Sequence, residues 1–68
     1  MNKGHTKYIH SEALVDSPHI GSGTRICRNV HIMKGAIIGK NCNICEGCYI
    51  ENHVRIGNGV TIKNNVTL

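Results

Sequence analysis

The sequence predicts an all-β fold, a parallel β-helix of about three coils, from two regularities in residue spacing. First, an aliphatic residue occupies every sixth position from Ile20 to Leu68, which suits the two-residue period of a strand and would scatter these side chains around a helix. Second, the residue three places after each isoleucine is Gly, Asn or His, the types that best tolerate a positive φ. Short strands therefore alternate with sharp corners, and three hexads close one triangular coil.

The aliphatic positions are expected to form three stacks inside the coil, one on each face. Their members are Ile20, Ile38 and Ile56; Ile26, Ile44 and Ile62; and Ile32, Ile50 and Leu68. Parallel strands lie about 4.8 Å apart, so each side chain packs on the one a coil below it. The residue four places after each isoleucine is small or β-branched because it also points inward, where the corner leaves little space.

Residues 1–13 are predicted to form an irregular N-terminal segment, and residues 14–68 the β-helix. Leu14 lies six residues before Ile20, and Tyr8 lies six before Leu14, so the spacing of six reaches back into this segment. Val15 and Pro18 nevertheless indicate a first coil that is only partly in register. We expect residues 8–15 to lie near this coil and residues 1–7 to be frayed.

The aliphatic series also bears on whether the sequence is complete. Leu68 opens a hexad that the sequence does not finish, whereas natural solenoids end on a polar cap. The sequence is therefore predicted to be an N-terminal fragment, either a truncated gene product or part of a longer protein.

Composition narrows the possible partners and location. Lys and Arg number 8 against 4 Asp and Glu, but these charges are scattered along the chain. With 2 Tyr and neither Phe nor Trp, there is little to stack on bases, so we expect no nucleic-acid partner. The sequence has no apolar run long enough to span a membrane and no apolar core of a signal peptide near its N-terminus. A cytoplasmic protein without a membrane partner is predicted.

The four cysteines are not predicted to bind metal. Cys42 and Cys48 occupy inward corner positions, whereas Cys45 between them points outward, so the three thiols cannot converge on one tetrahedral ion. Cys27 and Cys45 lie one coil apart, at a Cα spacing that permits a disulfide, but a cytoplasmic chain should keep them reduced.

Among the five histidines, His31 faces outward on a strand, where a neutral imidazole can act as a base or bind a phosphate. An ordinary surface histidine is the plainer interpretation. A γ-type carbonic anhydrase uses a similar β-helix and binds zinc through histidines from adjacent subunits. Only His31 and His53 lie within the regular coils here, so a fragment of such an enzyme stays an alternative.

Three segments carry a resemblance to a known family: ALVDSPHIGSGTRI at residues 13–26, HIMKGAIIGKNCNI at 31–44 and VRIGNGVTIKNNVTL at 54–68. They resemble hexapeptide-repeat acyltransferases, and most closely the bacterial N-acetyltransferases that modify 3-amino groups of nucleotide-linked sugars. The resemblance implies a left-handed β-helix, a homotrimer with active sites between subunits, acetyl-CoA as co-substrate, and a role in surface-polysaccharide biosynthesis.

On this resemblance, the candidate substrate-binding residues are His31, Lys34, Asn64 and Asn65. Lys34 could meet a phosphate or a sugar carboxylate, and the two asparagines could hydrogen-bond the sugar, although Lys34 also fits a solvated surface position and Asn65 a corner. The family usually has Trp where this chain has Cys27. Its donor-binding and catalytic segments follow the stretch that matches residues 64–66, so the catalytic residues are unknown, and whether the 68-residue chain is itself an enzyme is left open. A non-catalytic β-helical oligomerisation module is the second alternative.

Overall fold

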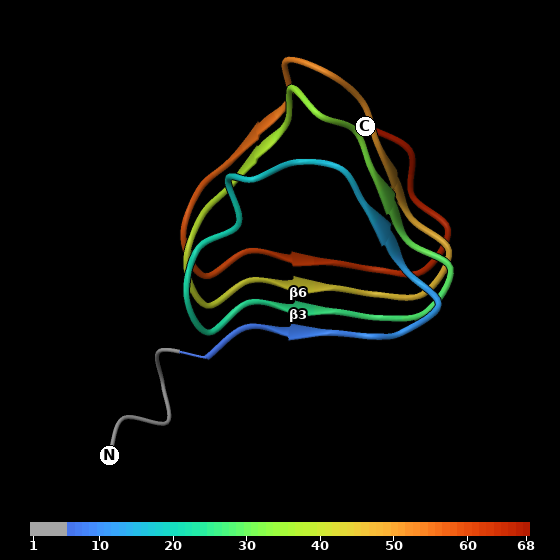
Figure 1. Cartoon of the computed structure of the whole chain (residues 1–68), viewed down its shortest axis with the longest axis horizontal. Coiled ribbons are helices and arrows are strands. Elements are labelled where there is room, and N and C mark those ends of the chain that lie inside the picture. Colours follow the sequence, from blue (N-terminus) through green and yellow to red (C-terminus); the bar gives the residue numbers. More distant parts are fainter. Residues whose placement is uncertain (1–5) are drawn as a thin grey trace.

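The computed structural model describes residues 6–68, and every strand in this range is two residues long and pairs in parallel (Figure 1). The strands are β1 Tyr8–Ile9, β2 Leu14–Val15, β3 Arg25–Ile26, β4 His31–Ile32, β5 Ile37–Ile38, β6 Asn43–Ile44, β7 Tyr49–Ile50, β8 Arg55–Ile56 and β9 Thr61–Ile62. The predicted fold class is confirmed: the molecule is an all-β, left-handed parallel β-helix. The predicted fraying of residues 1–7 falls mostly on residues 1–5, which lie outside the described residues.

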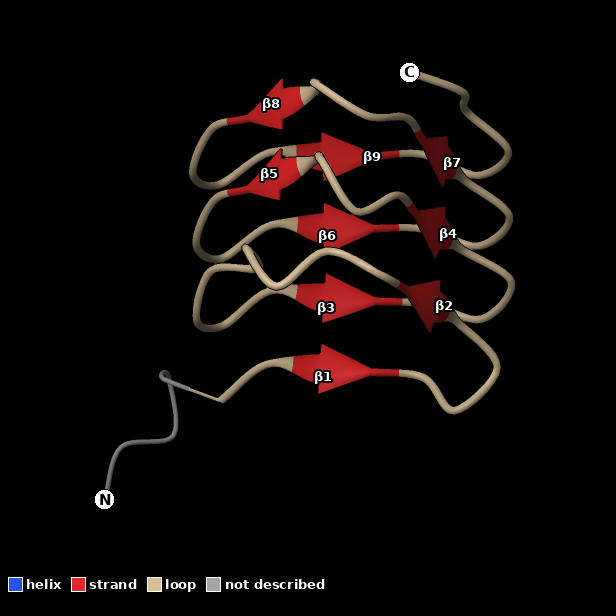
Figure 2. Ribbon diagram, turned by 45° about the horizontal axis from the view of Figure 1, so that its top comes forward, coloured by secondary structure: helices blue, strands red, loops and turns tan. Residues whose placement is uncertain are grey.

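Three flat sheets enclose the prism (Figure 2). Face A contains β1, β3, β6 and β9, face B contains β2, β4 and β7, and face C contains β5 and β8. Face C is extended by the bridge from Ile20 to Ile38, and face B by the bridge from Tyr49 to Thr67. In the regular coils each residue pairs with the residue 18 places later, as Ile26 does with Ile44, so the predicted closure by three hexads is confirmed.

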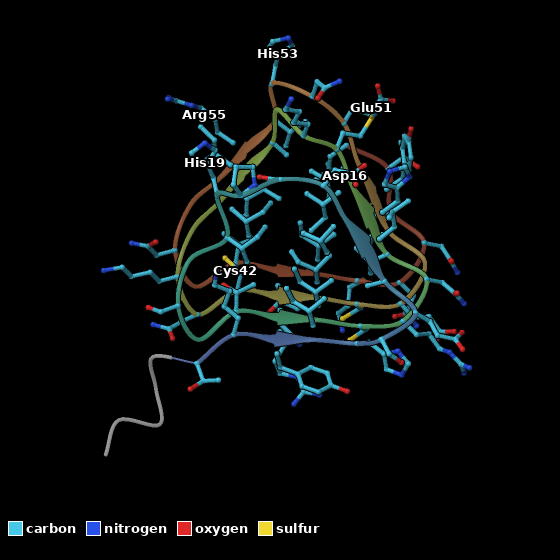
Figure 3. The ribbon with its side chains drawn as sticks, viewed as in Figure 1. Asp16, His19, Cys42, Glu51, His53 and Arg55 are labelled. Carbon is cyan, nitrogen blue, oxygen red and sulfur yellow. The ribbon has the colours of Figure 1, made fainter. Side chains whose placement is uncertain are left out.

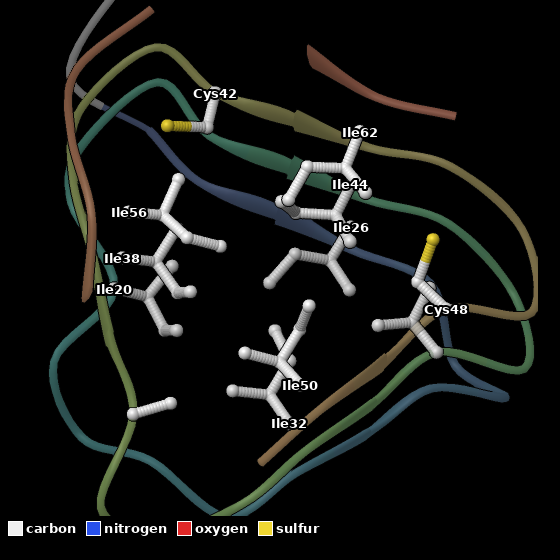
Figure 4. Packing of buried hydrophobic residues seen from close by; sticks show 12 residues of the cluster. Ile20, Ile26, Ile32, Ile38, Cys42, Ile44, Cys48, Ile50, Ile56 and Ile62 are labelled. Atoms are coloured by element: carbon white, nitrogen blue, oxygen red, sulfur yellow. The ribbon is translucent and has the colours of Figure 1, made fainter. Parts of the chain in front are cut away.

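The core contains the eight isoleucines of the three predicted stacks (Figure 4). Leu68, which was predicted to end the third stack, is 45% exposed and lies outside the core. Ile26, Ile32, Ile44 and Ile50 are completely buried, and each packs in register on the isoleucine of the neighbouring coil. The inward corner positions complete the core, as Val30 and other small or branched residues are also buried: Thr24, Ala36, Cys42 and Cys48. The narrow interior is thereby filled without any aromatic side chain.

The corners use left-handed backbone at seven of the eight expected positions. Asn29, Asn41, His53 and Asn65 have φ values between 56° and 71°, and Gly23, Gly47 and Gly59 adopt the same region. Gly35 is the exception, so the expectation is wrong there. Its N–H donates to Asn52 Oδ1 at 2.7 Å, and the next N–H, that of Ala36, donates back to the Met33 carbonyl at 3.1 Å. These two bonds close the turn without a left-handed residue.

Asn41 offers a direct test of the left-handed corners. Its φ is 56°, and its side chain makes no hydrogen bond to any described residue, so substitution mainly changes the backbone preference. We expect Asn41→Ala to lower the free energy of unfolding by about 1 kcal/mol, because a Cβ without a compensating polar group disfavours this region. Asn41→Gly should leave it nearly unchanged. Urea unfolding followed by circular dichroism measures both, and equal effects would contradict the backbone explanation.

The first coil differs from the predicted register by one residue. Ile9 pairs with Ile26 and Val15 with Ile32, so these two residues, and not Tyr8 and Leu14, continue the inward stacks. Leu14 instead points outward and is 55% exposed. The missing residue is absorbed between Val15 and Ile20. There the buried Ser17 hydroxyl donates to the Ala36 carbonyl at 2.6 Å and accepts the His19 N–H at 3.0 Å, replacing a regular corner.

Glycines follow the strands of face C where neighbouring coils come closest. A Cβ added to Gly39 would lie 2.5 Å from Asn58 Oδ1 and 2.7 Å from the Gly57 carbonyl carbon. A Cβ on Gly21 would likewise overlap the Gly39 backbone, whereas one on Gly57 meets nothing within 4 Å. Asn58 Oδ1 also accepts the Lys40 N–H at 2.8 Å, which fixes the coil spacing at this point. Glycine is therefore required at Gly21 and Gly39 for close backbone approach.

Candidate functional site

The four candidate substrate-binding residues lie on one face and the two corners beside it. His31 opens strand β4 on face B, and Lys34 lies in the turn that follows this strand. Asn64 and Asn65 lie at the corner between faces A and B, after strand β9. Among residues 6–68, no hydrogen bond or ion pair joins any two of the four. The structure therefore places them in one region without bringing them into contact.

His31 is the best organised of the four. Strand pairing places it between Leu14 and Tyr49 in an outward-facing column on face B. Its ring meets the Tyr49 ring edge to face, with centroids 5.0 Å apart and planes at 80°, a favourable aromatic arrangement. On the other side, His31 Nε2 lies 3.5 Å from Asp16 Oδ2. The imidazole is thus held between an aromatic ring and a carboxylate.

The Nε2 atom of His31 is shielded from solvent, and no group among residues 6–68 hydrogen-bonds to it. Asp16 is too far away for a good hydrogen bond, although its carboxylate can stabilise a positive charge on the ring. Tyr49 Oη donates to Met33 Sδ at 3.3 Å and so does not compete for the imidazole. His31 Nε2 therefore has no partner among residues 6–68, and a ligand can reach it only after the ring turns this nitrogen toward solvent.

Asp16 and Tyr49 were not identified from the sequence as parts of a site. A regular coil of 18 residues would place Asp16 opposite Lys34 of the next coil. Because the first coil is one residue shorter, Asp16 lies opposite Met33, directly after the strand that carries His31. The Asp16 N–H donates to the Ile32 carbonyl at 2.8 Å, the hydrogen bond that a residue opposite Met33 makes in a parallel pair. Tyr49 could have been found, since it follows His31 by one regular coil. Figure 3 shows Asp16 and Glu51 on one side of the apex at His53, and His19 and Arg55 on the other.

Lys34 and Asn64 are exposed, and neither side chain has a hydrogen-bond partner among residues 6–68. Asn65 has a φ of 58°, and its N–H donates to the Glu46 carbonyl at 2.9 Å, so it acts as a corner residue. Its side-chain oxygen lies over Gly47, at the place where a Cβ would be. No pocket indents the surface of the part of the chain that the structure describes. Within one chain, the region is an open surface.

The cysteines divide into two classes by their position. Cys42 and Cys48 are buried, and their thiols lie 3.0 Å from the Gly57 carbonyl oxygen and 2.9 Å from that of Lys63. Cys27 and Cys45 are half-buried on the outside of face A, and all four cysteines are free. Over residues 6–68, no three His, Cys, Asp or Glu side chains gather closely enough to hold a metal ion. The same range contains no helix of the length and apolar character needed to cross a membrane.

The sequence matches the model of one protein family, described as bacterial transferase hexapeptide (six repeats), over residues 17–52. This match covers more than half of the chain and includes His31 and Lys34, whereas Asp16 and residues 53–68 lie outside it. No curated protein matches the sequence significantly.

Proposed function

Because the chain belongs to the bacterial transferase hexapeptide family, we propose that it serves an acetyl-CoA-dependent N-acyltransferase that acts on a nucleotide-linked amino sugar. The single observation that supports this role best is the imidazole of His31, which is held between Tyr49 and Asp16 and whose Nε2 has no hydrogen-bond partner among residues 6–68. Surface-polysaccharide biosynthesis is the pathway proposed for such a substrate, following the resemblance in sequence.

In the proposed reaction, the protein has to position the amine against the thioester carbonyl and to stabilise the charges that develop. The neutral amine of the sugar attacks the thioester carbonyl of acetyl-CoA, and the products are an amide and free CoA. His31 Nε2 is proposed to accept a proton or hydrogen bond from the substrate once the ring turns this nitrogen outward, with the Asp16 carboxylate stabilising the ring when it is protonated. Lys34, at the adjacent turn, is proposed to meet a phosphate of the nucleotide.

A small substrate is usually bound in a concave site, and face B is open. We therefore propose a homotrimer in which a neighbouring subunit covers face B and completes the site. The flat faces of the prism and the exposed Leu14 beside His31 are compatible with such packing. Sedimentation equilibrium tests the assembly, and a monomer at the concentrations used for activity would contradict it.

Binding of the sugar provides a test that does not depend on turnover. A UDP- or dTDP-linked 3-amino sugar is titrated into the protein by calorimetry. His31→Ala is expected to weaken its binding about tenfold, corresponding to one lost hydrogen bond to a polar ligand. His53→Asn is the matched control, because His53 is an exposed corner residue with a φ of 71°, asparagine tolerates this backbone region, and binding should stay unchanged. Equal affinities of the His31 variant and the unaltered protein would contradict the assignment.

Acetyl transfer from acetyl-CoA to the same amino sugar then tests the reaction itself. Release of free CoA and formation of the N-acetyl sugar are both measured, and His31→Asn should reduce kcat/KM by roughly 10²-fold if the ring accepts the proton.

The second candidate function is a non-catalytic oligomerisation module, which the absence of a pocket in residues 6–68 favours. A trimer that neither binds nor acetylates the sugar would support this second function.

A further inference from the structure

Two of the four cysteines are adjacent on the outside of the β-helix. Cys27 directly follows the inward Ile26 of β3, and Cys45 directly follows the inward Ile44 of β6, so both side chains face outward. Ile26 and Ile44 are paired in register, and the chain stays paired one residue further. There the Cys27 N–H donates to the Ile44 carbonyl at 3.0 Å, and the Cys45 N–H donates to the Ile62 carbonyl at 2.9 Å. Cys27 and Cys45 are therefore neighbours on successive coils.

We propose that Cys27 and Cys45 are a thiol modification site, reduced in a reducing compartment as the structure has them, that forms a reversible disulfide across two successive coils when a disulfide oxidant is present. Neighbouring parallel strands lie about 4.8 Å apart, within the range of Cα separations of roughly 4.4–6.8 Å that disulfides span. Both thiols are half-buried and free, so a small reagent can reach them. The described residues offer no third metal ligand beside the pair, which favours a disulfide over a metal site.

The fold keeps the other two thiols out of this chemistry. The Cys42 thiol lies 3.0 Å from the Gly57 carbonyl oxygen and the Cys48 thiol 2.9 Å from the Lys63 carbonyl oxygen, and both residues are buried. Cys42 and Cys48 belong to different corners, so they do not face each other. The neighbour of Cys42 in the preceding coil is Thr24 and not a cysteine, and the Thr24 hydroxyl accepts the Cys42 N–H at 3.1 Å. The native fold thus selects one of the possible pairings.

The oxidant in this proposal is a low-molecular-weight disulfide, such as glutathione disulfide. One cysteine thiolate attacks a sulfur of the reagent, forms a mixed disulfide and releases one glutathione thiolate. The second cysteine thiolate then attacks the protein sulfur of the mixed disulfide and releases the second glutathione. The two protein thiols lose two protons and two electrons in total, and the reagent's S–S bond becomes two thiols. A dithiol reductant reverses both steps.

The test exposes the native protein to glutathione disulfide, blocks remaining thiols with N-ethylmaleimide in denaturant, and measures the mass. The expected product has lost two hydrogen atoms and carries only two maleimide groups, and dithiothreitol restores all four thiols. Digestion at Lys, Arg and Glu should give residues 26–28 joined to residues 41–46, with residues 47–51 separate. Fragmentation of the linked peptide locates the blocked cysteine at Cys42.

Three variants sharpen the assignment. Cys27→Ser and Cys45→Ser should each form a mixed disulfide with one glutathione and no internal bond, whereas Cys42→Ala should keep the internal bond. If Cys42→Ala does not fold, fragmentation of the linked peptide from the unaltered protein gives the same assignment. In the native state, Cys27 and Cys45 should react with maleimide at least ~10-fold faster than Cys42 and Cys48. A bond between any other two cysteines, a stable product with two glutathiones, or an internal bond in both serine variants would overturn the proposal.

Discussion

Replacing Ile44 with alanine is expected to lower the free energy of unfolding by about 3 kcal/mol. Ile44 is completely buried and lies in the middle of a stack, with Ile26 on one side and Ile62 on the other. Removing its outer carbons leaves a gap that neither neighbour can fill, because each is held in place by its own strand pairing. A small domain has a total stability of only about 5–15 kcal/mol, so this loss is a large fraction of it.

Ile37 provides the matched control for Ile44. It is the same residue type in a strand of the same length, but it points outward from β5 and is 39% exposed. Ile37→Ala should therefore cost less than about 1 kcal/mol. Urea unfolding of the two variants measures the difference, and similar midpoints for both would show that the isoleucine stacks do not carry the stability of the β-helix.

Replacing Gly39 with alanine is expected to lower the free energy of unfolding by about 2 kcal/mol, through overpacking between coils. The new methyl group would lie 2.7 Å from the Gly57 carbonyl carbon, which is backbone and cannot rotate away. It would also displace Asn58 Oδ1 from the Lys40 N–H, which it accepts at 2.8 Å. The coils must separate locally, and the strand pairing of β5 with β8 then weakens.

Gly57 is the control for Gly39, since it occupies the equivalent place one coil later and an added Cβ meets nothing within 4 Å. Gly57→Ala should be neutral or stabilise by a few tenths of a kcal/mol, because alanine restricts the unfolded chain more than glycine does. Thermal unfolding by circular dichroism compares the two variants. A Gly57 variant as unstable as the Gly39 variant would indicate that glycine is needed along face C for a reason other than coil contact.

The regular coils could be predicted from the sequence because a single spacing repeats through them. Each hexad contains the same three types of residue: a branched aliphatic residue that is buried, a small residue that points inward at the corner, and a residue that tolerates a left-handed bend. The exceptions arise where a side-chain hydrogen bond between coils takes over one of these roles. Gly35 needs no left-handed bend because Asn52 binds its N–H, and the first coil can be short because Ser17 closes it.

The candidate site was less predictable than the fold for a related reason. His31 was found because it is a histidine at an outward strand position, and Tyr49 follows it by one regular coil. Asp16 belongs to the one coil whose length departs from the rule, so counting residues along the chain places it beside the wrong neighbour. Lys34, Asn64 and Asn65 were selected by resemblance, and within residues 6–68 none of them forms a hydrogen bond or ion pair with His31.

The short first coil has a consequence for how this molecule can change over evolutionary time. The lost residue is absorbed at a corner, and the strands on either side keep Val15 and Ile20 on the inside. On each face, pairing with the strand of the neighbouring coil therefore decides which residues point inward. An insertion or deletion at a corner does not change which residues point inward further along the chain. Length changes at the corners can alter which outer side chains become neighbours, as with Asp16 and His31, while the interior stays intact. A β-helix of this kind can therefore vary its surface chemistry by gaining or losing single residues, a kind of change that would turn a buried face outward in an ordinary strand.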